Sequence, residues 1–344
     1  MLKVLVVDDT ETYRLLLTHI IEATSDMRVV GQAKNGQQAV QMASELRPDV
    51  ILMDVTMPLM DGLQATQEIM RQMPTPIVMI SASLEGRETE IAFQAIKRGA
   101  LTLLAKPSGP GNPTYDEQAA LITTTVRNMA GVRVIRHYQS TSISAKHPVS
   151  IGAVLEICAI ASSTGGPAAL GEIIRALPAD FPLPIVVAQH IAADFVPSLC
   201  SWLNTLTPLN VQIAQVGDKP KVGAIYFASA VANLVMTSEK RFGLDRSQIT
   251  RYTPSCDVFL ESVAQHYGRH AVGIVLTGMG NDSARGLLKM YQAGAITIAQ
   301  DESTSVVYGM PKEAVALGGA QFILGLPEIA STLMSFVFQK GSVL

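Results

Sequence analysis

The sequence of 344 residues predicts two α/β domains, each built on a doubly wound parallel sheet. Short apolar runs rich in β-branched residues alternate with segments of helical periodicity in both halves of the chain. Polar residues follow the ends of these runs, where ligand crevices form in parallel sheets. A stretch without acidic residues, 127–152, separates the halves and is typical of a linker. We therefore expect one domain at 1–126 and a second at 153–344.

Composition limits the classes of function. Hydrophobic residues make up 48% of the chain and charged residues 16%, which is enough apolar content for two buried cores. The formal net charge of −3 gives no indication of nucleic-acid binding. No apolar run reaches the roughly 18 residues of a membrane-spanning helix, and the N-terminal run is too short for a signal peptide. The sequence thus predicts a cytoplasmic protein without membrane insertion, whose three cysteines are reduced core thiols: Cys158, Cys200 and Cys256.

The first half contains five apolar runs and four segments of helical spacing. The expected strands are 4–7, 28–33, 50–53, 77–81 and 101–105. The expected helices lie near 13–23, 36–46, 63–73 and 89–98. Strict alternation of the two kinds of element indicates a parallel sheet with helices on both faces.

Five polar side chains follow the strands of this first half: Asp8, Asp9, Asp54, Ser81 and Lys106. Three carboxylates at one sheet edge repel one another and suit a hard divalent cation such as Mg²⁺. The lysine can pair with a carboxylate or with incoming phosphoryl oxygens, and the serine can hydrogen-bond to the same oxygens. Isolated acids at strand ends are common on protein surfaces, but this ordered set predicts a phosphate-handling site.

With the run Met57-Pro58-Leu59-Met60-Asp61-Gly62 and the pair Lys106-Pro107, the set resembles a two-component receiver domain. The resemblance implies a flavodoxin-like fold, phosphorylation of Asp54, and binding of Mg²⁺ by Asp8, Asp9 and Asp54. It also implies that Ser81 and Lys106 sense the acyl phosphate. Leu103 stands where receivers often carry an aromatic residue that reorients on phosphorylation, which argues against a ring-rotation switch.

The second half shows the same alternation. The expected strands are 154–161, 185–189, 211–216, 224–228, 272–276 and 295–299. The expected helices lie near 168–176, 196–203, 256–267 and 283–293. A doubly wound parallel sheet with an antiparallel edge is the simplest arrangement.

Ser163, His190 and Asp282 each follow one of these strands. Parallel strands bring their carboxyl ends to one edge, so the three side chains are expected in one crevice. A serine hydroxyl needs a base to act as a nucleophile, and the base needs an acidic partner. Taken singly, the serine and the aspartate are also good helix N-caps and the histidine an ordinary loop residue. Their joint placement predicts a catalytic triad, and the glycine-rich loop 277–281 offers backbone N–H groups for an oxyanion.

Four motifs carry a closer resemblance: Ser162-Ser163-Thr164-Gly165-Gly166, Gln189-His190, Pro254-Ser255-Cys256-Asp257 and Leu276-Thr277-Gly278-Met279-Gly280-Asn281-Asp282. They resemble the chemotaxis protein-glutamate methylesterase (CheB) family, and with the receiver the resemblance covers the whole chain. It implies a Rossmann-like esterase domain with the Ser163–His190–Asp282 triad and without a cofactor, and Met279 as a backbone oxyanion donor. Thr164 lies next to the nucleophile and could hydrogen-bond to the imidazole.

The resemblance further implies the reaction and its partners. Methyl-accepting chemotaxis receptors would be the substrates, losing methyl esters from glutamate and amide groups from glutamine. A chemotaxis histidine kinase would be the phosphodonor, and phosphorylation of Asp54 would relieve masking of the esterase site by the receiver. Three departures from the family pattern leave the receptor partner open: Ala161 in place of glycine, the segment 229–233, and Arg251-Tyr252-Thr253.

Three other functions fit the sequence less well. A transcription factor would need a basic helix-turn-helix after the linker, and the second half is long and not basic. A nucleotide-binding module would need a GxGxxG or GK[ST] loop, which the sequence lacks. A catalytically weakened relative that acts as an adaptor or phosphate sink remains the main alternative.

Overall fold

The computed structural model describes residues 1–81, 94–96, 98–130, 132, 154–247 and 252–338. The chain divides into two compact units, Met1–Gln139 and Ser140–Leu344. Most of the expected linker, 131 and 133–152, lies outside the described residues. The last helix of the first unit, α5 (Tyr115–Met129), runs past residue 126, where we expected the first domain to end.

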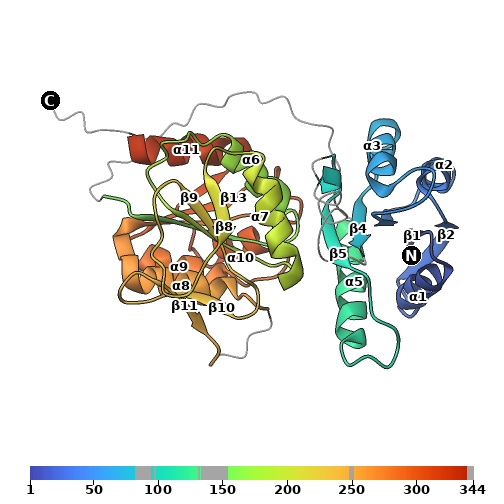
Figure 1. Ribbon diagram of the computed structural model, residues 1–344, viewed down its shortest axis with the longest axis horizontal. Helices are drawn as coiled ribbons and strands as arrows, with labels where there is room; N and C mark the ends of the chain where they lie inside the picture. Colours follow the sequence, from blue (N-terminus) through green and yellow to red (C-terminus); the bar gives the residue numbers. More distant parts are fainter. Residues whose placement is uncertain (82–93, 97, 131, 133–153, 248–251, 339–344) are drawn as a thin grey trace. The chain divides into compact units, whose positions relative to one another are not determined.

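The first unit is a five-stranded sheet in the order β2-β1-β3-β4-β5, and every neighbouring pair is parallel (Figure 1). The strands are β1 (Leu2–Val7), β2 (Met27–Ala33), β3 (Val50–Asp54), β4 (Ile77–Ser81) and β5 (Thr102–Ala105). The helices are α1 (Glu11–Glu22), α2 (Gly36–Leu46), α3 (Gly62–Gln72) and α5. The order confirms the expected flavodoxin-like fold. The helix expected near 89–98 lies largely outside the described residues.

Local sequence explains how α3 begins beside the end of β3. Asp61 and Gln64 form a capping box, which satisfies backbone N–H groups at the start of the helix. Gly62 follows, and a Cβ atom there would lie 2.1 Å from the carbonyl oxygen of Asp54. Only glycine allows this approach, which places α3 directly against the strand that carries Asp54.

The second unit is a seven-stranded sheet in the order β14-β13-β12-β6-β7-β9-β8, and all its neighbouring pairs are parallel. The strands are β6 (Ile157–Ser162), β7 (Ile185–Gln189), β8 (Asn210–Ile213), β9 (Ala224–Phe227), β12 (Ala271–Val275), β13 (Ile296–Gln300) and β14 (Phe322–Leu324). The longer helices are α6 (Gly166–Arg175), α7 (Val196–Asn204), α8 (Cys256–Tyr267), α9 (Ala284–Gln292), α10 (Met310–Ala316) and α11 (Leu326–Phe338).

The prediction of an antiparallel strand at the edge of this seven-stranded sheet is wrong. The antiparallel strands β10 (Asn233–Met236) and β11 (Phe242–Asp245) pair only with each other, as a separate two-stranded sheet. The hairpin is held by α8 instead of the sheet edge, since the backbone N–H of Met236 donates a hydrogen bond to Ser262 Oγ at 2.9 Å.

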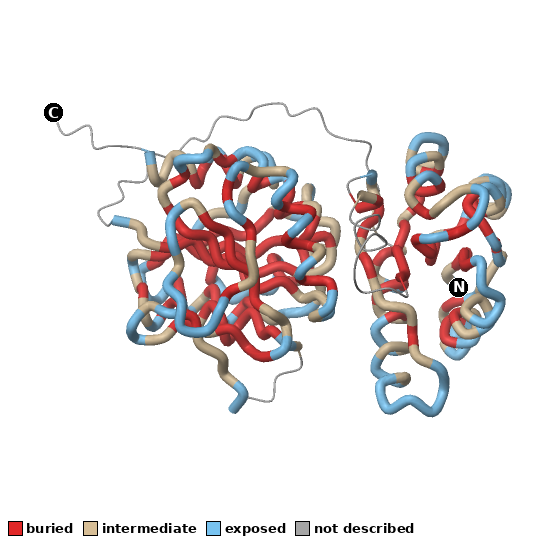
Figure 2. The backbone as a smooth tube through the Cα atoms, in the orientation of Figure 1, coloured by how far each residue is buried: buried red, intermediate tan, exposed pale blue. Residues whose placement is uncertain are grey.

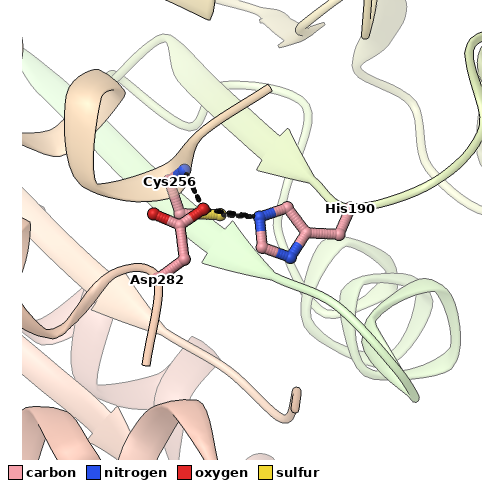
Figure 3. Close-up of side chains that lie close together, drawn as sticks. All are labelled: His190, Cys256 and Asp282. Carbon is pink, nitrogen blue, oxygen red and sulfur yellow. Dashed lines mark hydrogen bonds and ion pairs between the residues drawn. The ribbon is translucent and has the colours of Figure 1, made fainter. Parts of the chain in front are cut away.

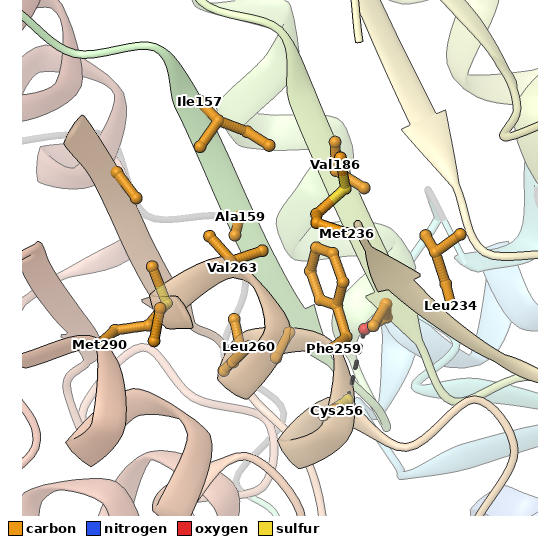
Figure 4. Close-up of a cluster of buried hydrophobic side chains, with 14 of the residues drawn as sticks. Ile157, Ala159, Val186, Leu234, Met236, Cys256, Phe259, Leu260, Val263 and Met290 are labelled. Atoms are coloured by element: carbon orange, nitrogen blue, oxygen red, sulfur yellow. Dashed lines mark hydrogen bonds between the residues drawn. The ribbon is translucent and has the colours of Figure 1, made fainter. Parts of the chain in front are cut away.

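Helices cover both faces of this sheet, with α6 and α11 on one face and α8 and α9 on the other (Figure 1). The strands form the buried centre of the unit (Figure 2). Phe259, Leu260 and Val263 of α8 pack against Ile157 and Ala159 of β6 (Figure 4). Among the described residues, no helix has the length and apolar content to cross a membrane.

The order of the strands predicts where a ligand can bind. β6 and β12 are neighbours, but the chain continues from β6 toward β7 on one side and from β12 toward β13 on the other. Connections that leave in opposite directions open a crevice at the carboxyl ends of the two strands. Ser163 follows β6, and the loop that leads to Asp282 follows β12.

Candidate active site

A tight turn between β6 and α6 carries Ser163. Its backbone N–H donates to the carbonyl oxygen of Thr277 at 3.1 Å, and its own carbonyl accepts from Gly166 N at 2.8 Å. Gly165 has φ +80°, a left-handed conformation that favours glycine, and a Cβ there would lie 2.6 Å from the Cβ of Val306. The turn therefore requires the small residues after the serine, and it leaves Ser163 half-buried at the end of the strand.

The two adjacent serines have different environments. Ser162 is the last residue of β6 and is fully buried, and its hydroxyl donates a 2.6 Å hydrogen bond to Gln189 Oε1. Ser163 lies outside the strand and retains exposed surface. A hydroxyl that is buried and already bonded is a poor nucleophile, so the structure favours Ser163 for contact with a substrate.

Gln189 connects the loops of the serine and the histidine. Its Nε2 donates to the carbonyl oxygen of Ser163 at 2.8 Å and to that of His190 at 2.9 Å. Its Oε1 accepts the hydroxyl hydrogen of Ser162, so one buried amide group bonds to three residues of the site. The sequence marked Gln189 as part of a motif but did not predict this role.

His190 and Asp282 form a hydrogen bond of 2.8 Å between Nε2 and Oδ2 (Figure 3). Their side chains are 9% and 12% exposed, so the pair lies at the edge of solvent. Because Nε2 faces the carboxylate, Nδ1 is the ring nitrogen left to exchange a proton with a reacting group. This is the base-and-acid pair that the sequence predicted from residues 92 positions apart.

The carboxylate of Asp282 is held at the N-terminus of α8. Oδ1 accepts from Ser255 Oγ at 2.8 Å and from Asp257 N at 2.9 Å, and Oδ2 also accepts from Cys256 N at 2.9 Å. Burial raises the pKa of this carboxyl, but the hydrogen bonds from His190 and from the two backbone N–H groups outweigh it and lower the pKa overall. Asp282 therefore caps α8 and not the helix that follows it in sequence, and it stays ionised beside the imidazole.

Two further residues contact the imidazole of His190. The ring of Tyr252 stacks on it with 4.7 Å between ring centroids and 23° between the planes. Cys256 Sγ lies 3.4 Å from Nε2. The sequence identified Tyr252 only as a departure from the family pattern, and no local signal predicts that it covers the histidine.

The glycine-rich loop after β12 packs against the serine turn. Thr277 is buried, and its hydroxyl donates to the carbonyl oxygen of Thr164 at 2.9 Å. A Cβ at Gly278 would lie 2.8 Å from the Cβ of Ser163, so glycine is needed for this close approach. The half-buried Met279 follows directly, and its role as a backbone donor stays a prediction.

The first unit has its own polar cluster at the sheet edge. Lys106 Nζ lies 2.7 Å from Asp8 Oδ2 and 3.0 Å from Asp54 Oδ2. Burial, and then the charge of Asp8, raise the pKa of Asp54 to about 7, although Lys106 opposes the shift. Ser81 ends β4, where its carbonyl oxygen accepts from Lys106 N at 2.8 Å. The structure thus brings the predicted receiver residues together.

These carboxylates fit a hard cation. One oxygen of each of Asp8, Asp9 and Asp54 can be chosen so that the three lie within 4.8 Å of one another. All-oxygen ligand sets of this kind suit Mg²⁺. The residues present are therefore compatible with the metal expected from the sequence.

Comparison with known proteins identifies both units. Residues 4–112 match the response regulator receiver domain, and residues 158–333 match CheB methylesterase. The chain belongs to the CheB methylesterase family.

Relatives in this family align with the chain from end to end. Protein-glutamate methylesterase/protein-glutamine glutaminase 4 of Myxococcus xanthus (strain DK1622) is 39% identical over 99% of both chains. The protein of the same name from Geobacter metallireducens is also 39% identical, over 99% of this chain and all of the relative. The crystal structure of the Thermotoga maritima CheB methylesterase catalytic domain is 36% identical, covers 54% of this chain and all of its own, and has a TM-score of 0.52. The expected family and fold class are thereby confirmed.

Proposed function

We propose that this chain hydrolyses glutamate γ-methyl esters on methyl-accepting chemotaxis receptors and deamidates receptor glutamines. The names of its full-length relatives support this activity. The observation that carries the proposal is the 2.8 Å hydrogen bond between His190 and Asp282, in the crevice that also receives the Ser163 turn. The family resemblance also implies that the reaction takes place in the cytoplasm.

In the proposed mechanism Ser163 Oγ attacks the γ-carbonyl carbon of the glutamate ester. His190 Nδ1 accepts the hydroxyl proton, and ionised Asp282 stabilises the imidazolium through Nε2. The oxyanion accepts a hydrogen bond from the backbone N–H of Met279, and Thr164 supports the imidazole. The imidazolium then protonates the leaving methanol, and water resolves the acyl-enzyme by the same route. With a glutamine substrate ammonia leaves instead, and no metal is needed at this site.

The receiver unit regulates this activity in our proposal. A chemotaxis histidine kinase supplies the phosphoryl group to Asp54. Asp8, Asp9 and Asp54 would hold Mg²⁺, which would supply positive charge for the phosphoryl oxygens. Lys106 and Ser81 then bond to the phosphoryl group attached to Asp54.

In this proposal the esterase site is in equilibrium between a masked and an unmasked state. Phosphorylation of Asp54 favours the unmasked state, since an equilibrium shifts only when the two states are stabilised differently. Removing residues 1–130 should therefore raise basal esterase activity. A 150–344 fragment no faster than the unphosphorylated full chain would contradict masking without affecting the proposed chemistry.

The activity is tested by incubating the full chain with methylated receptor membranes. We expect release of methanol from methylated receptors and of ammonia from receptors that carry glutamine at the same sites. If neither product forms, the chain is the catalytically weakened adaptor or phosphate sink that the sequence left as the alternative.

A further inference from the structure

A third metal-binding side chain lies beside the His190–Asp282 pair. Cys256 Sγ is 3.4 Å from His190 Nε2, and the candidate ligand atoms of the three residues lie within 4.8 Å of one another (Figure 3). Thiolate, imidazole and carboxylate are the ligands that Zn²⁺ takes in proteins. The proposed mechanism uses the histidine and the aspartate but gives the thiol no part.

We propose that His190, Cys256 and Asp282 form a Zn²⁺ site whose occupation switches the hydrolase off. The binding follows from the geometry of the three side chains, whereas the inhibition rests on the proposed function. The three side chains leave the fourth position of a tetrahedral zinc to water.

The two distances from His190 Nε2 require only a small adjustment. Tetrahedral zinc with ordinary bond lengths separates nitrogen and oxygen ligands by about 3.3 Å and nitrogen and sulfur ligands by about 3.6 Å. The corresponding distances here are 2.8 Å and 3.4 Å. A rotation of the His190 ring that opens the pair by about half an ångström would make room for the cation. Asp282 can keep its hydrogen bonds from Ser255 and Asp257, which use the other carboxylate oxygen.

The charges also balance. Without metal, the cluster holds one carboxylate, a neutral imidazole and a thiol, with a net charge of −1. When zinc binds, bonds form to Nε2, Sγ and Oδ2, the thiol proton leaves to water, and the imidazole proton moves from Nε2 to Nδ1. The occupied site is neutral, which favours it in a largely buried position. The positive end of α8 opposes the cation, and the thiolate offsets this repulsion.

Zinc binding prevents His190 from acting as the general base. Nδ1 carries a proton once Nε2 is bound to metal, so it cannot accept the proton of Ser163. The site also differs in kind from the cluster of Asp8, Asp9 and Asp54, which offers oxygen ligands alone. Mg²⁺ therefore suits the receiver and Zn²⁺ the esterase site.

Cobalt provides a readout of binding that is independent of catalysis. Co²⁺ added to the full chain in excess Mg²⁺ should produce the near-ultraviolet absorption band of a cobalt–thiolate bond, and Zn²⁺ should abolish it. Oxygen ligands in the receiver cannot give this band. It should persist in Cys200→Ala, which removes another buried thiol, and disappear in Cys256→Ala and His190→Ala.

Inhibition is then measured as methanol release. Zn²⁺ at about the protein concentration should inhibit the wild type and Cys200→Ala, and a chelator should restore both rates. The rate of each variant with metal is compared with its own rate without metal. Cys256→Ala should need at least about tenfold more Zn²⁺ than the wild type for half-inhibition, which corresponds to 1.4 kcal/mol. Circular dichroism checks the fold, and Cys256→Ser serves if the alanine variant does not fold.

The two proposals fail separately. Absence of the band in the wild type, or its persistence in Cys256→Ala, overturns the zinc site whatever the enzyme does. A band without any ester or amide hydrolysis leaves the zinc site standing and refutes the proposed function.

Discussion

Asp54 ends β3, and Asp282 lies in the loop after β12, so both are at the carboxyl edge of a parallel sheet. Both carboxylates are largely buried, yet their pKa values shift in opposite directions. Burial raises both pKa values. At Asp54 the neighbouring charge of Asp8 adds to the effect, and the pKa reaches about 7. At Asp282 the hydrogen bonds from His190 and from the start of α8 reverse it. Burial acts in the same direction on both carboxyls, so their different partners account for the opposite shifts.

This difference matches two kinds of chemistry. The receiver cluster collects negative charge that Lys106 partly offsets, so it is suited to a divalent cation and a phosphoryl group. The esterase cluster stabilises one ionised carboxylate with fixed backbone donors and presents a polarised imidazole.

Replacing the charged carboxylate of Asp282 should nearly abolish hydrolysis. In Asp282→Asn the amide donates to His190 Nε2, which leaves the proton on Nδ1 and removes the base. We expect kcat for methanol release to fall about 10⁴-fold. Asp245→Asn, on the strand β11 away from the histidine, is the matched control and should keep its rate. A loss of less than about tenfold in Asp282→Asn would show that the carboxylate does not set the tautomer.

The raised pKa of Asp54 makes the receiver less stable as the pH rises. Its pKa is about 7 in the folded protein, whereas the ordinary value for an aspartate, which the unfolded chain adopts, is 3.8. Between these two values the folded state holds a proton that the unfolded state has lost. Without Mg²⁺ the free energy of unfolding should therefore fall from pH 4 to pH 7, by at most a few kcal/mol.

Asp54→Asn should remove most of this dependence and stabilise the receiver at pH 8. The measurement is urea denaturation followed by the NMR signals of the buried methyl groups of β1 and β3. Equal pH dependence in the wild type and in Asp54→Asn would contradict the assigned shift.

The smallest expected effect concerns the aromatic cover of the base. A stacked aromatic pair contributes about 0.5–1.5 kcal/mol, so Tyr252→Ala should lower kcat up to about tenfold while KM changes little. Tyr252→Phe keeps the ring and should retain the wild-type kcat. If phenylalanine is as slow as alanine, the hydroxyl and not the stacking is what matters.

Much of the fold was predictable because the strands are short apolar runs and the chemical residues follow them directly. The sequence missed α5, where the run Thr123-Thr124-Thr125 has low helix propensity but the helix is fixed by its buried face. It also missed β10, β11, β14, α10 and α11. The antiparallel edge it predicted was not tied to particular residues, and the antiparallel pair β10 and β11 lies outside the main sheet.

The site was predicted through residues that end strands, and missed where the contacts come from packing alone. Tyr252 and Cys256 reach His190 from more than 60 positions away. Cys256 stood in a family motif and Tyr252 in a departure from the pattern, but neither feature indicated contact with the histidine. The bridging role of Gln189 was not predicted for another reason. Its three hydrogen bonds depend on how closely β6 and β7 are paired.

The most direct test of the account compares two adjacent serines. Methanol release from methylated receptor membranes should fall by at least about 10⁴-fold in Ser163→Ala, because the nucleophile is lost. Ser162→Ala removes only the buried hydrogen bond to Gln189, so it should lower stability by about 1–3 kcal/mol and leave most of the activity. Loss of activity in Ser162→Ala with a normal rate in Ser163→Ala would contradict the assignment of Ser163 as the nucleophile. Normal rates in both variants would exclude the triad.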